Sequence, residues 1–386
     1  MMSNNFHPVE AKNRIELLDV LRGFAIAGVL LVNILYFSGY LYTPFEDMAK
    51  MSFPQLNNTL IAIIFPVLLG KFYPILAMLF GAGLFMQFKK RQNPGFLKFF
   101  IKRMSLLILI GALHELIWPG DVVMVYALFA FLMIPLRNFK PKQYLVFAVI
   151  MLILNFVALY LTDLFMPAKP ILERTAHMHL SDFSPNELVA MIQNDGFNGF
   201  ITLIKTHLGV VWTIERYGSL SFRILLIFAT GAYLFGSGFL MEKAHKLKYF
   251  FLFLVIGLLG SYLMYYVSWY FKIIDNLFLA LTYISLVAVL MKTKLGYKML
   301  KGLAPLGRMA LTNYIFQSVL GIIIFYGIGF GFFGKLPLYQ IQMIGIVMLI
   351  TQIQFSKFWL KKYNFGPIEW LWRRLTYGKQ LNNVKK

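Results

Sequence analysis

The chain of 386 residues contains no cysteine. Disulfide bonds and thiolate chemistry are therefore excluded, and the cysteine count says nothing about the redox compartment. Charged residues are also scarce. They make up 14% of the chain, whereas a soluble domain has about 25%. Hydrophobic residues make up 59%, and this composition predicts a polytopic membrane protein built from transmembrane helices.

The sequence also lacks several common catalytic and nucleotide-binding motifs. It has no GxGxxG or P-loop pattern in a strand-to-helix setting, no HExxH and no nucleophile elbow. A cleaved signal peptide is not expected either, because a polar segment precedes the first apolar run and no small-residue cleavage pattern follows it. We expect the first helix to remain in the chain as an anchor.

Acidic residues are fewer than basic ones, 16 against 37, which gives a formal net charge of +21. In a soluble protein this excess would indicate nucleic-acid binding. Here the basic residues lie in short loops between apolar runs, a distribution typical of cytoplasmic loops that face anionic lipid headgroups. We therefore expect the lipid bilayer and anionic headgroups at the basic tail as partners, and no nucleic acid.

About ten apolar runs are long enough to cross a bilayer as helices. They lie near 16–37, 60–88, 102–118, 121–136, 143–162, 219–240, 249–270, 273–291, 309–330 and 338–360. The second run is interrupted by Pro66, Gly70, Lys71 and Pro74. This interruption predicts a surface or re-entrant helix followed by a span at 72–88. Basic residues fill every other loop, which places both termini in the cytoplasm. The expected fold class is an all-α membrane helical bundle.

The runs divide the chain into five segments. They are a cytoplasmic N-terminal segment (1–15), the first five spans (16–162), an extracytoplasmic segment with amphipathic helices (163–217), the last five spans (218–360) and a basic cytoplasmic tail at the interface (361–386). Ser184, Pro185 and Glu187 have the spacing of a helix start. His177 and His179 could ligate a metal, but nearby carboxylates show no fixed pattern. We favour a solvated loop there and expect no metal site.

Three polar residues lie in the first apolar run. Asp19 and Arg22 are three positions apart and share one face of a helix, and Asn33 lies near the far end. Two interpretations are open. In one, these residues line a polar groove into the membrane, because a charge in a membrane helix usually faces the protein interior or a wet cavity. In the other, Asp19 and Arg22 form a pair that ends the helix and reaches the cytoplasmic surface.

A second polar group surrounds the turn after the third span. His114 and Glu115 lie in the last turns of an apolar helix, and Asp121 opens the next helix, where the helix dipole favours a carboxylate. In one interpretation Asp121 caps this helix and His114 bonds to a neighbouring backbone group. In the other, His114 is a general base that Asp121 or Glu115 orients, reached from a cavity in the outer half of the membrane. Local evidence slightly favours the structural interpretation.

A third polar group comes near the end of the chain. Arg308 precedes the ninth span, and Asn313 and Gln317 are four positions apart on one face of it. These amides either contact a ligand or pack against another helix. The segment 366–376 is amphipathic, aromatic and basic, so we expect it to lie in the cytoplasmic interface of the membrane.

Five stretches together resemble the YeiB-like family of bacterial membrane proteins, whose domain is one of unknown function (DUF418). They are LLDVLRGFAIAGVLLVNI at 17–34, LFGAGL at 79–84, GALHELIWPGDVVMVYAL at 111–128, GRMALTNYIFQS at 307–318 and FGPIEWLWRRLTYG at 365–378. The resemblance covers nearly the whole chain. It implies a multi-pass protein of the bacterial inner (cytoplasmic) membrane.

The first of these stretches is also similar to the opening of the transmembrane acyltransferase superfamily. Those enzymes move an acyl group, often acetyl from acetyl-CoA, onto a sugar hydroxyl or amine across the membrane. Their D-x-x-R-G pattern is matched by Asp19, Arg22 and Gly23. Asn33 stands where one branch has a catalytic histidine. The branch that acetylates the terminal glucosamine of heparan sulfate has an asparagine there, and takes its histidine from the following outer loop. This chain has no histidine between Asn33 and His114, so His114 would supply the base from a different helix.

The resemblance implies an acyltransferase with acyl-CoA as cytoplasmic co-substrate, no permanently bound cofactor, and a cell-envelope saccharide or related molecule as acceptor. Arg22 would stabilise the donor phosphates or the developing charge, and Asn33 would hold the thioester carbonyl or the acceptor. His114 would deprotonate the acceptor while Asp121 orients the ring. The expected substrate-binding residues are Asp19, Arg22, Asn33, Arg308, Asn313 and Gln317.

Two other classes of function are open. A transporter or flippase of a small polar or lipid-linked solute would use the broken second run and the buried amides as its pathway, although no repeat is visible. A non-catalytic membrane sensor would use 163–217 as its receptor surface. Stabilisation of the purified protein by acyl-CoA would favour the enzyme.

Overall fold

A computed structural model of the protein describes residues 14–43, 48, 51–118, 120–165, 185–194, 196, 198–202, 214–378 and 381–385. Across these residues the structure is helical, and its one β interaction is an isolated bridge between Tyr363 and Val384. The α-helices are α1 (Glu16–Phe37), α3 (Pro54–Val67), α4 (Phe72–Phe88), α5 (Phe96–Glu115), α6 (Val123–Leu132), α7 (Pro141–Phe165), α9 (Pro185–Asn194), α11 (Ile214–Gly236), α12 (Phe239–Glu242), α13 (Leu247–Tyr266), α14 (Lys272–Leu290), α15 (Lys294–Leu300), α16 (Ala304–Arg308), α17 (Ala310–Phe325), α18 (Leu338–Lys362) and α19 (Pro367–Tyr377). Short 3-10 helices are η2 (Tyr40–Tyr42), η3 (Ile134–Asn138), η4 (Trp269–Phe271) and η5 (Lys301–Leu303).

Six helices in the described ranges are long and apolar enough to cross a membrane. They are Glu16–Phe37, Pro54–Phe88, Pro141–Leu164, Leu247–Tyr266, Trp269–Leu290 and Leu338–Lys362. A seventh span results if Lys294–Arg308 and Ala310–Phe325, which meet at an angle of 82°, are counted as one. The expected class, an all-α protein with membrane-spanning helices, is confirmed. The count of ten is not confirmed by these lengths and compositions.

The remaining expected spans differ from the six for separate reasons. α5 carries Lys98, Lys102 and Arg103 in its first half. α6 has only 10 residues, and η3 follows it closely. The described apolar part of α11, Ser221–Gly236, is also short. The helix α17 has 16 residues because the chain bends sharply before it. Hydropathy alone does not reveal such bends and short helices, so ten spans is still a prediction.

The expected break in the second run lies between α3 and α4, and α4 starts at Phe72 as predicted. A buried ion pair holds this break. Lys71 Nζ pairs with the carboxylate of Asp275 on α14 and donates to Asn276 Oδ1 at 3.0 Å. The hydroxyl of Ser261 also donates to Asp275, at 2.6 Å. Lys71 and Asp275 are 3% and 2% exposed, so each charge depends on the other for its stability.

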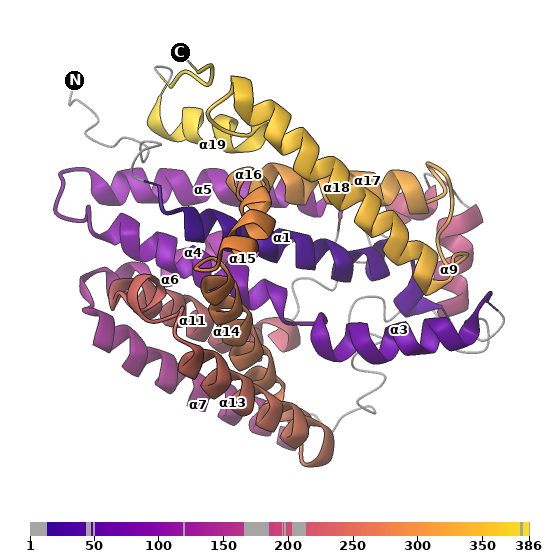
Figure 1. The fold of residues 1–386 in the computed structure, drawn as a ribbon, viewed down its shortest axis with the longest axis horizontal. Helices are drawn as coiled ribbons and strands as arrows, with labels where there is room; N and C mark the ends of the chain where they lie inside the picture. The colour runs from indigo at the N-terminus through magenta and orange to yellow at the C-terminus, as the bar shows by residue number, and fades with distance from the viewer. Residues whose placement is uncertain are drawn as a thin grey trace.

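The helices form an inner and an outer set. In the most apolar part of α1, 56% of the residues are buried, and in that of α14 the share is 61%. The corresponding shares are only 22% for α7 and 11% for α13. Apolar side chains such as Val146 and Ile153 of α7 and Val255 of α13 are exposed. α1 runs through the middle of the molecule, with α18 and α19 above it and α7 and α13 at the lower edge of the view (Figure 1). The outer helices thus present an apolar surface suited to lipid.

The two ends of the bundle carry different elements. The guanidinium of Arg14, just before α1, lies 5.7 Å from the centre of the Phe365 ring, just before α19. At the other end, Gln193 of α9 donates to the carbonyl of Phe333 at 2.6 Å. The described ends of the chain therefore share one end of the bundle, and α9 covers the opposite end. The start of α9 at Pro185 agrees with the predicted helix start, whereas His177 and His179 lie outside the described residues.

Two glycines let α1 and α16 touch through their backbones. A Cβ atom at Gly23 would lie 2.0 Å from the carbonyl oxygen of Leu303, and one at Gly307 would lie 1.9 Å from the carbonyl oxygen of Asp19. Such distances leave no room for a methyl group. Small residues allow this close approach of helices in membranes, and here they fix the position of α1 against the bent segment that precedes α17.

We expect Gly23→Ala to destabilise the protein by at least about 1–3 kcal/mol, because the added methyl group overpacks this contact. Gly83→Ala is the matched control, since Gly83 is also helical and a Cβ atom there meets nothing within 4 Å. Thermal unfolding of the purified protein in detergent checks this. Equal melting temperatures for the two variants would contradict the close contact between α1 and α16.

Candidate functional site

A chain of three side chains joins the turn before α6 to α5 and α17. The Nδ1 atom of His114 lies 2.8 Å from Asp121 Oδ1, and its Nε2 atom lies 2.9 Å from Ser318 Oγ. His114, Asp121 and Ser318 are 1%, 4% and 0% exposed. A carboxylate only accepts hydrogen bonds, so in the neutral ring Nδ1 carries the proton and Nε2 accepts the Ser318 hydroxyl.

The turn between α5 and α6 positions this group. His114 lies in the last turn of α5, and Asp121 Oδ2 accepts the backbone N–H of Met124 at 2.6 Å in the first turn of α6. Glu115 Oε2 accepts the backbone N–H of Asp121 at 3.1 Å. Asp121 therefore binds the first turn of α6 and His114 with the same carboxylate. The expected bond from His114 to a neighbouring backbone group is not seen, because both ring nitrogens lie against side chains. The bond from Glu115 stabilises the turn and does not involve the His114 ring.

The helix α17 supplies the other wall of the group. The hydroxyl of Tyr314 donates to the carbonyl of Gly120 and accepts the N–H of Val122, both at 3.3 Å. Its ring centre is 5.0 Å from that of His114. Tyr314 and Ser318 are one helical turn apart and face the same neighbour. The sequence interpretation missed Ser318, although the i, i+4 spacing from Tyr314 was the available signal.

The arrangement has the order of groups used in nucleophilic acyl transfer: a carboxylate, an imidazole and a hydroxyl. Asp121 orients the ring, and the free lone pair of Nε2 points at a hydroxyl that it can deprotonate. The same hydrogen bonds also satisfy both ring nitrogens. The geometry therefore suits a base and its nucleophile in a closed state, and equally a buried polar contact between three helices.

The polar residues of α1 lie apart from this group. Arg22 Nη1 is 2.8 Å from Asp19 Oδ1, with side-chain exposures of 30% and 12%, so the expected proximity of this pair is confirmed. Asn33 is half-buried, three helical turns further on, about 16 Å along the axis. The helix α17 contacts α1 and also binds His114 through Ser318. Asp19 and Arg22 lie near the start of α1, where this helix contacts α16. Among the described contacts, no hydrogen bond joins either residue to His114.

The amides predicted in α17 link three helices. Asn313 Nδ2 donates to Ser356 Oγ of α18 at 2.9 Å. Gln317 Nε2 donates to Gln352 Oε1 of α18 at 3.0 Å and to the carbonyl of Ile26 of α1 at 3.4 Å. Both are 1% exposed. Their described contacts are those of helix packing, and a role in substrate binding is still a prediction.

The start of α17 is held by a residue from α19. Glu369 Oε1 accepts the backbone N–H groups of Leu311 and Thr312 at 2.7 and 3.0 Å. Its second oxygen accepts the Thr312 hydroxyl at 2.5 Å. Arg308, just before α17, donates to the carbonyl of Asn364 at 3.5 Å. The tail segment expected at the membrane interface thus packs into the bundle through one side and bonds to the first turn of α17.

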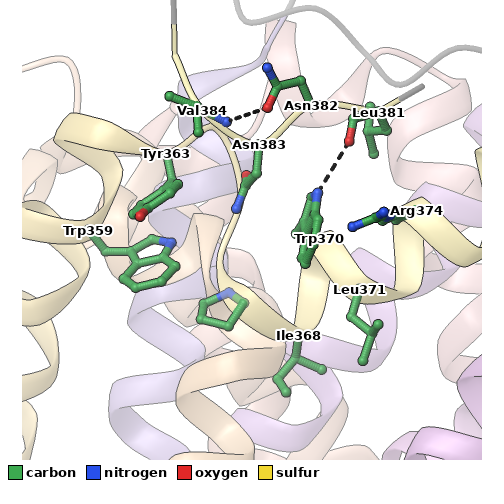
Figure 2. A pocket seen from close by; sticks show the side chains of 11 residues that line it. Trp359, Tyr363, Ile368, Trp370, Leu371, Arg374, Leu381, Asn382, Asn383 and Val384 are labelled. Carbon is green, nitrogen blue, oxygen red and sulfur yellow. Dashed lines mark hydrogen bonds between the residues drawn. The ribbon is translucent and has the colours of Figure 1, made fainter. Parts of the chain in front are cut away.

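A cavity of about 670 Å³ lies between the end of α18, α19 and the last described residues. Figure 2 shows its lining side chains, which include the aromatic rings of Trp359, Tyr363 and Trp370 beside Arg374 and Leu371. None of the residues predicted from the sequence lines it. Among the residues that the structure describes, no three His, Asp or Glu side chains gather as a metal site.

The fold and these contacts define a helical membrane protein with a buried polar centre. Comparisons with known proteins show which family it resembles. The family model "Protein of unknown function (DUF418)" matches residues 239–379. The uncharacterized protein YxaH of Bacillus subtilis (strain 168) is 29% identical over 400 residues, covering 97% of each chain. The uncharacterized protein YeiB of Escherichia coli (strain K12) is 28% identical over 397 residues, covering 93% of this chain and 95% of YeiB. No solved structure matches the chain.

These matches confirm the resemblance to the YeiB-like DUF418 family that was seen in the sequence. Two of the five stretches that carried the resemblance, at 307–318 and 365–378, fall inside the matched region. This similarity assigns no reaction, because the descriptions of the family and of these relatives name none.

Proposed function

We propose that the protein is an acyltransferase of the bacterial inner membrane. It transfers an acyl group from cytoplasmic acyl-CoA to a hydroxyl or amine of a cell-envelope saccharide or related acceptor. The observation that supports this proposal is the hydrogen-bonded chain Asp121–His114–Ser318, with distances of 2.8 and 2.9 Å. This order of groups activates a hydroxyl for attack on an acyl carbonyl.

The steps follow from the roles of the three side chains. His114 Nε2 takes the proton of Ser318 as Oγ attacks the thioester carbonyl, and the thiolate of CoA leaves and receives that proton. The resulting acyl-serine is then attacked by the acceptor, whose proton passes to His114 and then to Ser318 Oγ as it leaves. Asp121 keeps the ring oriented and stabilises its charged form. Because the three side chains are buried, α5, α6 and α17 must separate to admit the substrates.

In the donor site of this proposal, Arg22 contacts the CoA phosphates from the cytoplasmic side, with Asp19 fixing its guanidinium. Asn33 holds the thioester carbonyl or the acceptor further along α1. Arg308, Asn313 and Gln317 contribute to substrate binding when the helices open. The partial exposure of Arg22 and its pairing with Asp19 support this assignment.

We further propose that ten spans cross the membrane, with both termini in the cytoplasm and 163–217 outside. The alternating basic loops support this topology. Single cysteines at Lys90 and Asn194, both exposed, test it in a chain that has no other cysteine. In spheroplasts, whose cytoplasmic membrane is intact, a thiol reagent that does not cross the membrane should label position 194 and should not label position 90. The reverse labelling would overturn the orientation.

Replacing Arg22 by lysine should weaken acyl-CoA binding about tenfold or more, because a point charge does not reproduce the two parallel hydrogen bonds of a guanidinium. Calorimetry on the purified protein measures this affinity. Arg137→Lys is the control, since Arg137 lies in η3 and donates to the carbonyl of Ile134. If Arg22→Lys binds acyl-CoA normally and Arg22→Ala also folds and functions, then Arg22 only anchors the end of α1.

The acceptor is found by comparing envelope glycans and lipids, by mass spectrometry, between a deletion strain and a complemented strain.

With the product known, His114→Gln and Ser318→Ala should each lower turnover by about 10²-fold or more at near-normal protein levels. Asp121→Asn should retain partial activity, since it only orients the ring. His245→Gln, in a loop outside the site, should leave turnover unchanged.

A buried histidine with a structural role only would give a different result. Its loss would cost about 1–3 kcal/mol for each partner left unpaired and would reduce protein abundance, while the remaining folded protein would stay active. Trapping of the acyl group on Ser318, detected by peptide mass spectrometry, gives a second readout. An active His114→Gln variant would exclude the proposed chemistry.

A further inference from the structure

Four arginines meet at the end of the bundle where the described chain begins and ends. They are Arg14 before α1, Arg103 in α5, Arg308 in α16 and Arg373 in α19, which we call the arginine cluster. Arg14 and Arg373 approach the same ring, with their guanidinium carbons 5.7 and 4.6 Å from the centre of Phe365. The guanidinium of Arg103 lies 3.8 Å from the centre of the Trp372 ring, next to Arg373 in the chain.

The remaining contacts join these arginines into one group. Arg308 Nη2 donates to the carbonyl of Asn364, the residue before Phe365. The pKa of Lys385 is lowered by desolvation and then by the charges of Arg308 and Arg14. Burial likewise lowers the pKa of Arg373 to about 10, with the charge of Arg103 as the second cause. The cluster is therefore a patch of like charges that act on one another.

Several nitrogens of this cluster have no hydrogen-bond partner. Among the described residues, these buried and unpaired atoms are Arg103 Nε and Nη1, Arg308 Nε and Arg373 Nε. Arg103 is only 7% exposed. The neighbouring carboxylates are already engaged, since Asp19 pairs with Arg22 and Glu369 binds the start of α17. Buried hydrogen-bond donors without acceptors are costly in free energy, so the hydrogen bonding of the cluster is incomplete.

We propose that the arginine cluster is a binding site for the phosphate groups of a ligand. A single carboxylate would leave most of the charge unbalanced, whereas a diphosphate carries several charges and presents several oxygens. Guanidinium groups bind phosphate oxygens through paired N–H donors. Arg14, Arg308 and Arg373 are half-buried, so an anion reaches them from the end of the bundle, with Arg103 behind them.

Two sources of such phosphates share this chemistry: a soluble coenzyme or nucleotide, and the headgroup of an anionic lipid. This proposal does not depend on the acyl-transfer chemistry, because it rests on unpaired nitrogens and not on His114 and Ser318, although it shares Arg308 with the proposed substrate-binding residues. The test therefore uses three probes on the full-length protein in a neutral detergent. They are pyrophosphate, coenzyme A and cardiolipin. Pantetheine, the part of coenzyme A that lacks phosphate, is the negative control.

At least one of the three probes should raise the melting temperature of the protein, and native mass spectrometry should show it bound. Binding of pyrophosphate and coenzyme A would identify a soluble ligand, and binding of cardiolipin alone would identify a lipid. Affinity should fall with added salt, as expected for ion pairing at a partly exposed site. If none of the three binds, or if pantetheine binds as well as coenzyme A, the proposal is wrong.

Two neighbouring arginines of α19 give a matched pair of variants. Arg373→Gln removes a charge of the cluster and should weaken phosphate binding about tenfold or more. Arg374→Gln removes an equal charge one residue later, from an exposed side chain that lies beside Trp370 (Figure 2). It should change the affinity less than about twofold. Equal losses in both variants would indicate general surface charge and overturn the site.

The ligand-free protein provides a further readout. Because Arg373 lies among like charges with its Nε unpaired, and contacts only the Phe365 ring among the interactions described above, Arg373→Gln should melt at nearly the same temperature as the wild type when no anion is present. A clear drop in its melting temperature would show that Arg373 has a structural partner of its own, and would overturn the proposed site even if the variant also lost phosphate binding.

Discussion

Polar groups inside a bundle of apolar helices must find their partners within the protein, because the lipid offers none. This constraint organises most of the structure. Asn313 and Gln317 tie α17 to α18 and α1, and Lys71 and Asp275 fix the break between α3 and α4. His114 joins α5 to α6 and α17 through its two ring nitrogens. Single buried polar atoms without a partner occur elsewhere in the described residues, for example at Gln317 Oε1, but the arginine cluster brings several unpaired and positively charged donors together.

The opening motif of the chain combines two physical requirements. Asp19 and Arg22 form an ion pair that is partly exposed at the end of α1. Gly23 is needed for another reason, since its lack of a side chain lets α1 touch the backbone of Leu303. The pattern that resembles an acyltransferase motif in the sequence therefore serves helix packing as well as any chemistry. Its presence supports the proposed reaction less strongly than the geometry around His114 does.

Much of the helical framework could be predicted from the sequence, because length and hydropathy determine where a helix enters an apolar environment. The limits of α1 and the start of α4 at Phe72 agree with prediction. The short α6 and the bend before α17 were not predicted, since apolar residues on either side of a bend look the same as one continuous span. Within the candidate site, the nearness of Asp121 to His114 followed from their positions around one turn.

The spacing from Tyr314 marks Ser318 as a member of the same face of α17, but its pairing with His114 could not be predicted in this way. Ser318 is 204 residues from His114 in the chain, and only the folded arrangement of α17 and α5 brings the two together. The same holds for the arginine cluster, whose members come from four distant parts of the sequence. Helical periodicity reports which residues share a face of one helix, but it does not report which helices meet.

The bond between Glu369 and the start of α17 has a consequence for how the protein is made. The first N–H groups of a helix have no partner within the helix, and here two of them are satisfied by a residue that follows 57 positions after Thr312. During synthesis from the N-terminus, α17 is made before α19. The first turn of α17, the helix that carries Tyr314 and Ser318, therefore obtains these hydrogen bonds only after α19 has been made. It follows that the polar centre of the protein is completed late in biogenesis.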